Sequence, residues 1–214
     1  MISSTAPDRR AALKARHREA IIDAARMLVA EQGGPGFSVD ELATRADVAR
    51  RTIFNHFTSL DEILVTLCGD ELGVIIDDFI NAVTATPVGD GSRASMFDEL
   101  ARTLRSADIP SAIARITAIV GEPVPHDPRG RALKDEAFAR AGHRLVEVVG
   151  RRNPGVDSLE IEFLVGSLMN GMIVVATHWV TNTDARLDDQ GRDEWQRLLT
   201  RLIETVRTGY QPAP

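Results

Sequence analysis

The sequence predicts an all-α protein with a small N-terminal domain and a larger second domain. Apolar residues recur at helical spacing in nearly every long segment, and aromatic residues make up only 5% of the chain. A chain of 214 residues is long enough to build a hydrophobic core in each of two domains. We expect an N-terminal arm and a three-helix domain over residues 1–58, followed by a helical domain over residues 59–214.

The first helix is expected from about Ala11 to Gln32, because its apolar residues fall on one face and the glycine-rich stretch 33–36 follows it. Ser38 is the predicted N-cap of a short second helix, since its hydroxyl can accept a hydrogen bond from a free backbone N–H group. Glu41, three residues later, completes a capping box.

A third helix is expected to begin near Ala49, after a tight turn at Asp47 and Val48. Ile53 and Phe57 lie four residues apart on this helix and can pack inward together. The opposite face of the helix is polar and remains on the surface.

The helices that follow are mostly longer. Ser59 is predicted to cap a helix that ends near Ala85, with Glu62 as its capping-box partner and Pro87 beyond its end. Pro110 and a proline-containing loop divide the next segments. The further helices are expected at residues 93–107, 111–121, 129–151, 158–181 and 192–208.

Charge is unevenly distributed along the chain. The net charge is −6, but residues 1–66 carry 9 basic and 9 acidic side chains, so the other 16 basic and 22 acidic residues produce the whole deficit. A local basic surface attracts phosphate whatever the total charge. A solvated, disordered tail is the alternative for residues 1–10. The basic residues that precede Glu19 are Arg9, Arg10, Lys14, Arg16 and Arg18, opposed only by Asp8.

The cysteine content excludes a disulfide-stapled protein. Cys68 is the only cysteine, so it cannot form an intramolecular disulfide, and without a Cys/His cluster a structural zinc site is excluded. We expect no metal and no cofactor. The first 20 residues contain no apolar signal-peptide core, and a reducing cytoplasm fits the composition best.

With Ile53 and Phe57 packed inward, the third helix presents Arg50, Arg51 and Asn55 outward. Arginine can donate two hydrogen bonds to guanine, and asparagine can pair with adenine in the major groove. Polar side chains on the preceding helix can meet phosphates, which position a protein without reading sequence. An ordinary solvated helix is the alternative. The predicted DNA-binding residues are Ser38, Thr44, Arg45, Ala49, Arg50, Arg51, Thr52, Phe54, Asn55 and His56.

Residues 38–64, SVDELATRADVARRTIFNHFTSLDEIL, resemble the DNA-binding segment of the tetracycline-repressor (TetR) family. The resemblance covers about the first quarter to third of the chain and implies a helix-turn-helix whose third helix enters the major groove of DNA. The positions that match the family pattern are Ala43, Ala46, Val48, Thr52, Phe54, Phe57 and Ser59.

Four positions depart from the family pattern. Asp47 replaces a glycine and must take a left-handed backbone conformation. Ala49 and Phe54 lack the hydroxyls of the usual serine and tyrosine, and Leu60 replaces a lysine that family members often place on a phosphate. We hypothesise that the basic N-terminal segment compensates for these missing contacts.

The resemblance also implies that the rest of the chain binds a ligand and forms a dimer, often by pairing the last two helices across a two-fold axis. Residues 163–180 contain no charged side chain, which indicates burial on several sides. A membrane span is rejected because glycine, asparagine, threonine and histidine interrupt the apolar segment. An intramolecular core stripe is the alternative to an interface. The expected dimer-interface residues are Met172, Trp179, Trp195, Leu199, Leu202 and Val206.

Few residues indicate a ligand site. Asn170 and His178 lie two turns apart on the apolar helix and can face a ligand or hydrogen-bond across the dimer. The neighbouring apolar residues can line a pocket or form ordinary core. The candidate ligand-binding residues are Phe138, Phe163, Met169, Asn170 and His178.

The sequence therefore predicts a homodimeric, cytoplasmic transcription regulator that reads a pseudo-palindromic operator in double-stranded DNA. The resemblance implies that the protein represses transcription and that a small-molecule effector releases it from DNA. A body that serves only dimerisation or control by a partner protein is one alternative. An enzyme is the other, because His126–Asp127 is similar to the His-Asp dipeptide of helical metal phosphohydrolases. Flanking prolines take this pair off a helix, however, and the remaining histidines lack metal-ligand spacing.

Overall fold

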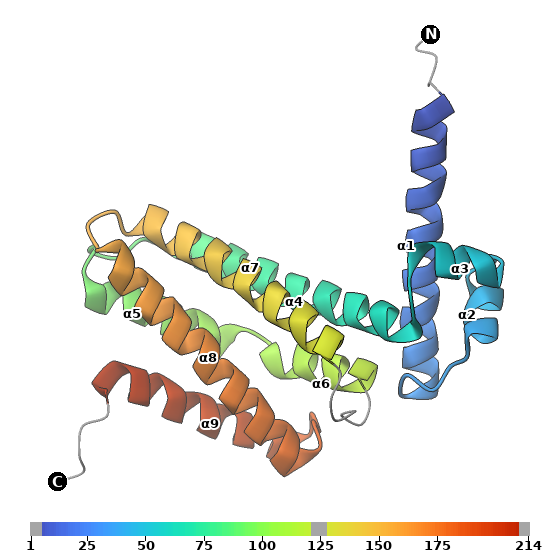
Figure 1. Ribbon diagram of the computed structural model, residues 1–214. Coiled ribbons are helices and arrows are strands. Elements are labelled where there is room, and N and C mark those ends of the chain that lie inside the picture. Colours follow the sequence, from blue (N-terminus) through green and yellow to red (C-terminus); the bar gives the residue numbers. More distant parts are fainter. Residues whose placement is uncertain (1–5, 121–127, 210–214) are drawn as a thin grey trace. The chain divides into compact units, whose positions relative to one another are not determined.

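The structure, a computed structural model, is all-helical in the part of the chain that it describes, which confirms the predicted fold class (Figure 1). It describes residues 6–120 and 128–209, and the side chains from residue 10 onward except those of 128–137 and 140. The helices are α1 (Ala6–Gln32), α2 (Val39–Arg45), α3 (Arg50–His56), α4 (Leu60–Ala85), α5 (Arg93–Ser106), α6 (Ile109–Val120), α7 (Pro128–Arg152), α8 (Ser158–Thr183) and α9 (Asp189–Thr208).

The chain divides into two compact units. The N-terminal unit holds the described residues up to Asp70 and those between Ile116 and Lys134. The second unit, the body, holds Glu71–Arg115 and the described residues from Asp135 onward. Helices α4, α6 and α7 each contribute residues to both units.

In the N-terminal unit, α2 and α3 pack against α1, and the start of α4 completes the core (Figure 1). Ile53 is 1% exposed and Phe57 is 2% exposed, so the pair expected to face inward does so. Ile63 and Leu67 of α4 are fully buried in the same core. The unit therefore extends into α4, whereas the sequence led us to expect a boundary after residue 58.

The starts of α2 and α3 follow local sequence signals. Ser38 Oγ accepts a hydrogen bond from the Glu41 backbone N–H at 3.2 Å, and the Glu41 carboxylate accepts one from the Ser38 backbone N–H at 2.7 Å, which confirms the capping box. Asp47 has φ 51°, the left-handed conformation that its turn position predicts. Ala49 precedes α3 and provides no side-chain cap.

The capping of α4 differs from the prediction. Ser59 Oγ accepts a hydrogen bond from the Glu62 backbone N–H at 3.2 Å, as an N-cap does. The Glu62 carboxylate accepts its bonds from Thr58, however, from the backbone N–H at 2.6 Å and from the hydroxyl at 2.7 Å. In the expected capping box the Glu62 carboxylate would accept from the Ser59 backbone N–H. It accepts from Thr58 instead, one residue earlier, and this contact fixes the link between α3 and α4.

Two later helices begin earlier than expected. Pro110 lies in the first turn of α6 rather than ahead of it, where a missing N–H group is tolerated because that turn has no acceptor for it. Asp188 caps α9, since its carboxylate accepts a hydrogen bond from the Gly191 backbone N–H at 2.8 Å.

A tryptophan pair joins α8 to α9 in the core of the body. Trp179 is fully buried and Trp195 is 1% exposed, and their rings meet edge to face with centroids 5.6 Å apart. Trp179 Nε1 donates a hydrogen bond to the Gly191 carbonyl oxygen at 2.7 Å. Gly171 allows the two helices to approach, because a Cβ atom there would lie 2.1 Å from Leu202 Cδ1.

Candidate nucleic-acid interface

The outward face of α3 is polar and aromatic. Arg50, Arg51 and Asn55 are exposed, Thr52 is half-buried, and the Phe54 residue is 49% exposed. The opposite face of the helix is held in the core of the N-terminal unit. Packing of one face therefore determines the direction in which the other face points, which suits a helix that must be presented to a ligand.

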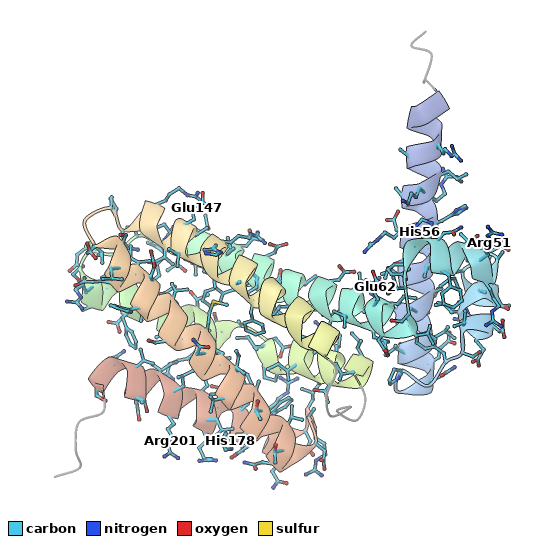
Figure 2. The ribbon with its side chains drawn as sticks, viewed as in Figure 1. Arg51, His56, Glu62, Glu147, His178 and Arg201 are labelled. Carbon is cyan, nitrogen blue, oxygen red and sulfur yellow. The ribbon has the colours of Figure 1, made fainter. Side chains whose placement is uncertain are left out.

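The two adjacent arginines of α3 differ in their partners. The Arg50 guanidinium lies 3.1 Å from an Asp40 carboxylate oxygen, and both side chains are exposed. Arg51 has no hydrogen-bond or ion-pair partner among the described residues. Figure 2 shows Arg51 at the end of α3 that lies away from α1. Arg51 is therefore the arginine whose donors are all available to a ligand.

Arg45 of α2 is held by α1. Its guanidinium donates hydrogen bonds to both Glu31 carboxylate oxygens, at 2.7 and 2.6 Å. The hydrogen bond from Arg45 is the largest cause that lowers the pKa of the Glu31 carboxyl group, and the same pair raises the pKa of Arg45. A phosphate that binds Arg45 has to compete with this carboxylate.

The remaining residues predicted on α2 and its flanks are exposed, but their hydroxyls have partners. Ser38 Oγ donates to the Glu41 carboxylate at 2.7 Å, and Thr44 Oγ1 donates to the Asp40 carbonyl oxygen at 2.9 Å. Ala49 is exposed and offers its methyl group and its backbone. A role for these residues at DNA remains a prediction.

His56, the last residue of α3, faces α1. Its ring is half-buried and meets the ring of His17 edge to face, with centroids 6.3 Å apart. Burial is the largest cause that lowers the pKa of His56 below 6.5, and the positive charges of Lys14, His17 and Arg18 lower it further. Sequence reasoning placed His56 at the interface but did not foresee that α1 would surround it with basic groups, because that contact depends on tertiary packing.

A family comparison decides what this unit is. Residues 21–67, which run from the middle of α1 through the first two turns of α4, match the profile described as "Bacterial regulatory proteins, tetR family". The N-terminal unit therefore carries the DNA-binding segment of the TetR family. The match confirms the resemblance drawn from residues 38–64, and α2 and α3 form the helix-turn-helix of this segment.

Solved structures share the fold over nearly the whole chain. A TetR-family transcriptional regulator from Streptomyces coelicolor is 19% identical, with a TM-score of 0.52 over 89% of this chain and 99% of that one. The regulator FadR from Bacillus subtilis, solved with stearoyl-CoA, is 19% identical, with a TM-score of 0.56 over 90% of this chain and 99% of that one. A TetR-family protein from Mesorhizobium loti is 18% identical, with a TM-score of 0.63 over 90% and 96% of the two chains. No curated protein sequence matches the chain.

The body corrects part of the expected dimer interface. Trp179, Trp195 and Leu199 are at most 1% exposed within one chain, so their side chains are unavailable to a partner. For these three residues the alternative of an intramolecular core stripe holds, because an apolar stripe does not distinguish burial within a chain from burial between chains. Met172, Leu202 and Val206 are half-buried at the edge of the same core, and their place in an interface remains a prediction.

The candidate ligand residues do not gather around one interior space. Phe163 is 66% exposed, and Asn170 and His178 are also exposed on α8, so these three side chains lie on the surface of the chain. Met169 and Phe138 are half-buried. A ligand-binding role for the five residues remains a prediction, and the exposure of Asn170 and His178 keeps the alternative of a hydrogen bond across the dimer open.

Two further sequence observations need a structural comment. The pair His126–Asp127 lies outside the described residues. Within the described ranges, no group of three or more His, Cys, Asp or Glu side chains could hold a metal ion. By length and composition alone, α8 is apolar enough to cross a membrane. Part of this helix is buried in the body, where Val175 and Trp179 lie in the core, and α8 packs against α9.

Proposed function

We propose that this regulator binds a specific operator in double-stranded DNA through α3, with Arg51 as its principal base-reading side chain. The observation that carries the proposal is an exposed Arg51 that has no partner within the described ranges, on a helix whose opposite face is buried and fixes its orientation. Arginine in the major groove donates two hydrogen bonds to the O6 and N7 atoms of guanine. Thr52 and Asn55 add a methyl group and an amide to the same surface. Arg45, Arg50 and His56 supply cationic or hydrogen-bonding contacts.

We propose further that two copies pair through the exposed face of α8. Phe163, Ile173 and Val174 are 66%, 38% and 57% exposed, and no charged residue separates them. A two-fold interface places each surface against its own copy, so an uncharged face meets no like charge. The outward face of α9, in contrast, carries exposed Arg197 and Arg201. Two paired copies would present two α3 helices to the half-sites of a pseudo-palindrome.

Control by a small molecule is the third part of the proposal. FadR, which shares the fold, was solved with stearoyl-CoA. In the body of this chain, Trp195 Nε1 is buried and has no hydrogen-bond partner among the residues that the structure describes, which is uncommon for a buried donor and leaves it available to an acceptor on a ligand. We propose that the protein is a repressor and that binding of such a ligand releases it from DNA. A body that only dimerises or meets a partner protein is the alternative.

We propose that the regulator is cytoplasmic, carries no membrane-spanning segment and is not an enzyme. The proposal treats α8 as a dimer helix, so a purified dimer that remains in solution without detergent supports it. Recovery of the full chain only in detergent micelles would contradict it.

The deciding experiment is DNA binding measured by fluorescence anisotropy. The probe is the duplex that flanks the chain's own gene, and the control is a random duplex of equal length and base composition. Preferential binding that survives moderate salt supports a sequence-specific regulator. Equal binding to both duplexes, lost steeply as salt rises, would overturn operator recognition at that duplex.

A further inference from the structure

A band of cationic and imidazole side chains continues from α3 onto α1. His56 and His17 meet edge to face, and the Arg18 guanidinium lies 5.1 Å from the centroid of the Phe57 ring. Lys14 is four residues before Arg18 and is exposed on the same side of α1. Figure 1 shows that the N-terminal half of α1 extends past α3 within this unit. The band therefore adjoins the outward face of α3 without interruption by the core.

This band is the continuation of the core-facing stripe of α1. Ile21 and Ala25 are fully buried in the core of the N-terminal unit. His17 and Lys14 lie one and two turns before Ile21 on the same face, and Arg18 lies two turns before Ala25. The stripe thus changes from apolar to basic at the point where α1 leaves the core. A sequence that kept α1 only for packing would not need basic residues on this face.

The groups that face His56 are mainly cationic. Lys14, His17 and Arg18 come from α1, and their charges lower the pKa of His56 in addition to the larger effect of burial. Glu62, in the first turn of α4, uses its carboxylate to accept two hydrogen bonds from Thr58. His56 is therefore mostly neutral at pH 7 in the free protein, and it lies in a positive potential that an anion would relieve.

We propose that Lys14, His17, Arg18 and His56 form a binding site for a backbone phosphate of DNA, and that this site takes up a proton when DNA binds. The inference rests on the proposed function and extends the DNA contact from α3 to α1. A phosphate beside an imidazole favours the imidazolium form, which then donates a charge-assisted hydrogen bond to the phosphate oxygen. The proton comes from solvent, and no covalent bond changes.

The sign of the pH dependence follows from linkage. The complex holds more protons than the free protein, so the association constant falls as pH rises between the free and bound pKa of the histidine. The dependence is at most tenfold per pH unit for each proton taken up. Because burial and the neighbouring cations lower the pKa of free His56, the window opens below the ordinary pKa of histidine and extends upward to the pKa of the DNA-bound form.

The test measures affinity for the own-gene duplex from about pH 6 to pH 8 at constant ionic strength. Wild-type protein should lose affinity severalfold across this range, and the double variant His17→Gln/His56→Gln should show a nearly flat profile. Lys14→Gln, at an exposed position, should reduce the salt slope by about one phosphate contact, while the affinity still falls as pH rises. His143→Gln on α7 is the matched control, because His143 is exposed in the body and far along the chain from this site.

The outcomes separate this inference from the proposed function. Suppose that wild-type protein prefers the own-gene duplex and that the double variant shows the same pH dependence as the wild type. The proton-linked phosphate site is then wrong, and operator binding stands. If wild-type protein shows no preference for that duplex over random DNA, operator recognition fails instead. A duplex with neutral methylphosphonates at single positions tests the ligand itself. The pH dependence should disappear at one symmetry-related pair of positions, and its persistence at every position would exclude a backbone phosphate.

Discussion

Arg45 of α2 donates two hydrogen bonds to Glu31 near the end of α1, whereas Arg51 of α3 has no partner among the described residues. The two arginines therefore differ in what DNA binding requires of them. On the proposed function, Arg45 has to exchange a carboxylate for a phosphate, whereas Arg51 loses only water. We therefore expect the α1–α2 ion pair to weaken non-specific affinity for DNA.

Glu31→Gln is expected to strengthen binding to DNA of any sequence. The amide cannot hold Arg45 as an ion pair, so the guanidinium meets a phosphate without competition, and one negative charge near the duplex is lost. Because the pair is solvent-exposed, the gain should be modest, up to about fivefold. Anisotropy titrations with own-gene and random duplexes measure it.

Asp23→Asn is the matched control for Glu31→Gln. It removes the same charge from an exposed residue of α1, but its partner is Arg26 rather than an arginine of α2. An equal gain in both variants would mean that only net charge matters and that the Arg45–Glu31 pair does not restrain binding.

Arg51→Ala is expected to weaken binding to the operator by roughly 1–3 kcal/mol and to relax the preference at one base position in each half-site. Since Arg51 makes no described contact in the free protein, the substitution should leave the melting temperature unchanged. Competition assays with duplexes that carry each base at each position measure the effect. Arg26→Ala, an exposed arginine of α1, is the control. An equal loss on random DNA would show that Arg51 contacts phosphate rather than a base.

The parts of this regulator that sequence predicts are those fixed by local chemistry. The Ser38–Glu41 capping box, the left-handed Asp47 and the inward pair Ile53 and Phe57 each depend on residues at most four apart. Contacts between helices were not predictable in this way. Glu31 and Arg45 are separated by 14 positions, and only the packing of α2 on α1 brings them together.

The same reason explains the errors in the body. Hydrophobic spacing indicated that both faces of α8 are apolar, but it could not say which face α9 covers. The structure buries Trp179 against Trp195 and leaves Val174 exposed. A residue can enter an interface only if its own chain leaves its side chain exposed. That exposure depends on the tertiary fold.

Arg152 is expected to be essential for the stability of the body. Its guanidinium contacts the Glu99 carboxylate at 2.6 Å, with side chains 13% and 6% exposed, and it donates hydrogen bonds to the carbonyl oxygens of Thr84 and Thr86 at the end of α4. Arg152→Ala leaves a buried carboxylate without its partner, so the free energy of unfolding should fall by about 3–5 kcal/mol. Chemical denaturation measures this loss.

The neighbouring Arg151 gives a control for that prediction. It pairs with Glu147 on the exposed surface of α7, so Arg151→Ala should change the free energy of unfolding by less than about 0.5 kcal/mol. The double variant Glu99→Gln/Arg152→Met should recover part of the stability lost in Arg152→Ala, because no buried charge remains. Equal destabilisation by all three changes would contradict the buried ion pair as the cause.

The exposed face of α8 yields the most direct test of assembly. Val174 is 57% exposed, so Val174→Glu should not disturb the core of one chain, and circular dichroism should be unchanged. In a two-fold dimer the substitution places two carboxylates in one apolar interface, where burying them without partners is costly. Sedimentation equilibrium should therefore show a monomer where the wild-type protein is a dimer. Affinity for a two-half-site duplex should fall with it, whereas a single half-site should be bound as before.

The charged face of α9 supplies the contrast that decides which helix forms the interface. Arg201→Glu reverses a charge on the exposed side of α9 and should leave the dimer intact, since we place that side in solvent. A dimer that survives Val174→Glu but dissociates in Arg201→Glu would transfer the interface from α8 to α9. That result would also free Phe163, Asn170 and His178 to serve another partner, because their uncharged surface would then be uncovered in the assembled regulator.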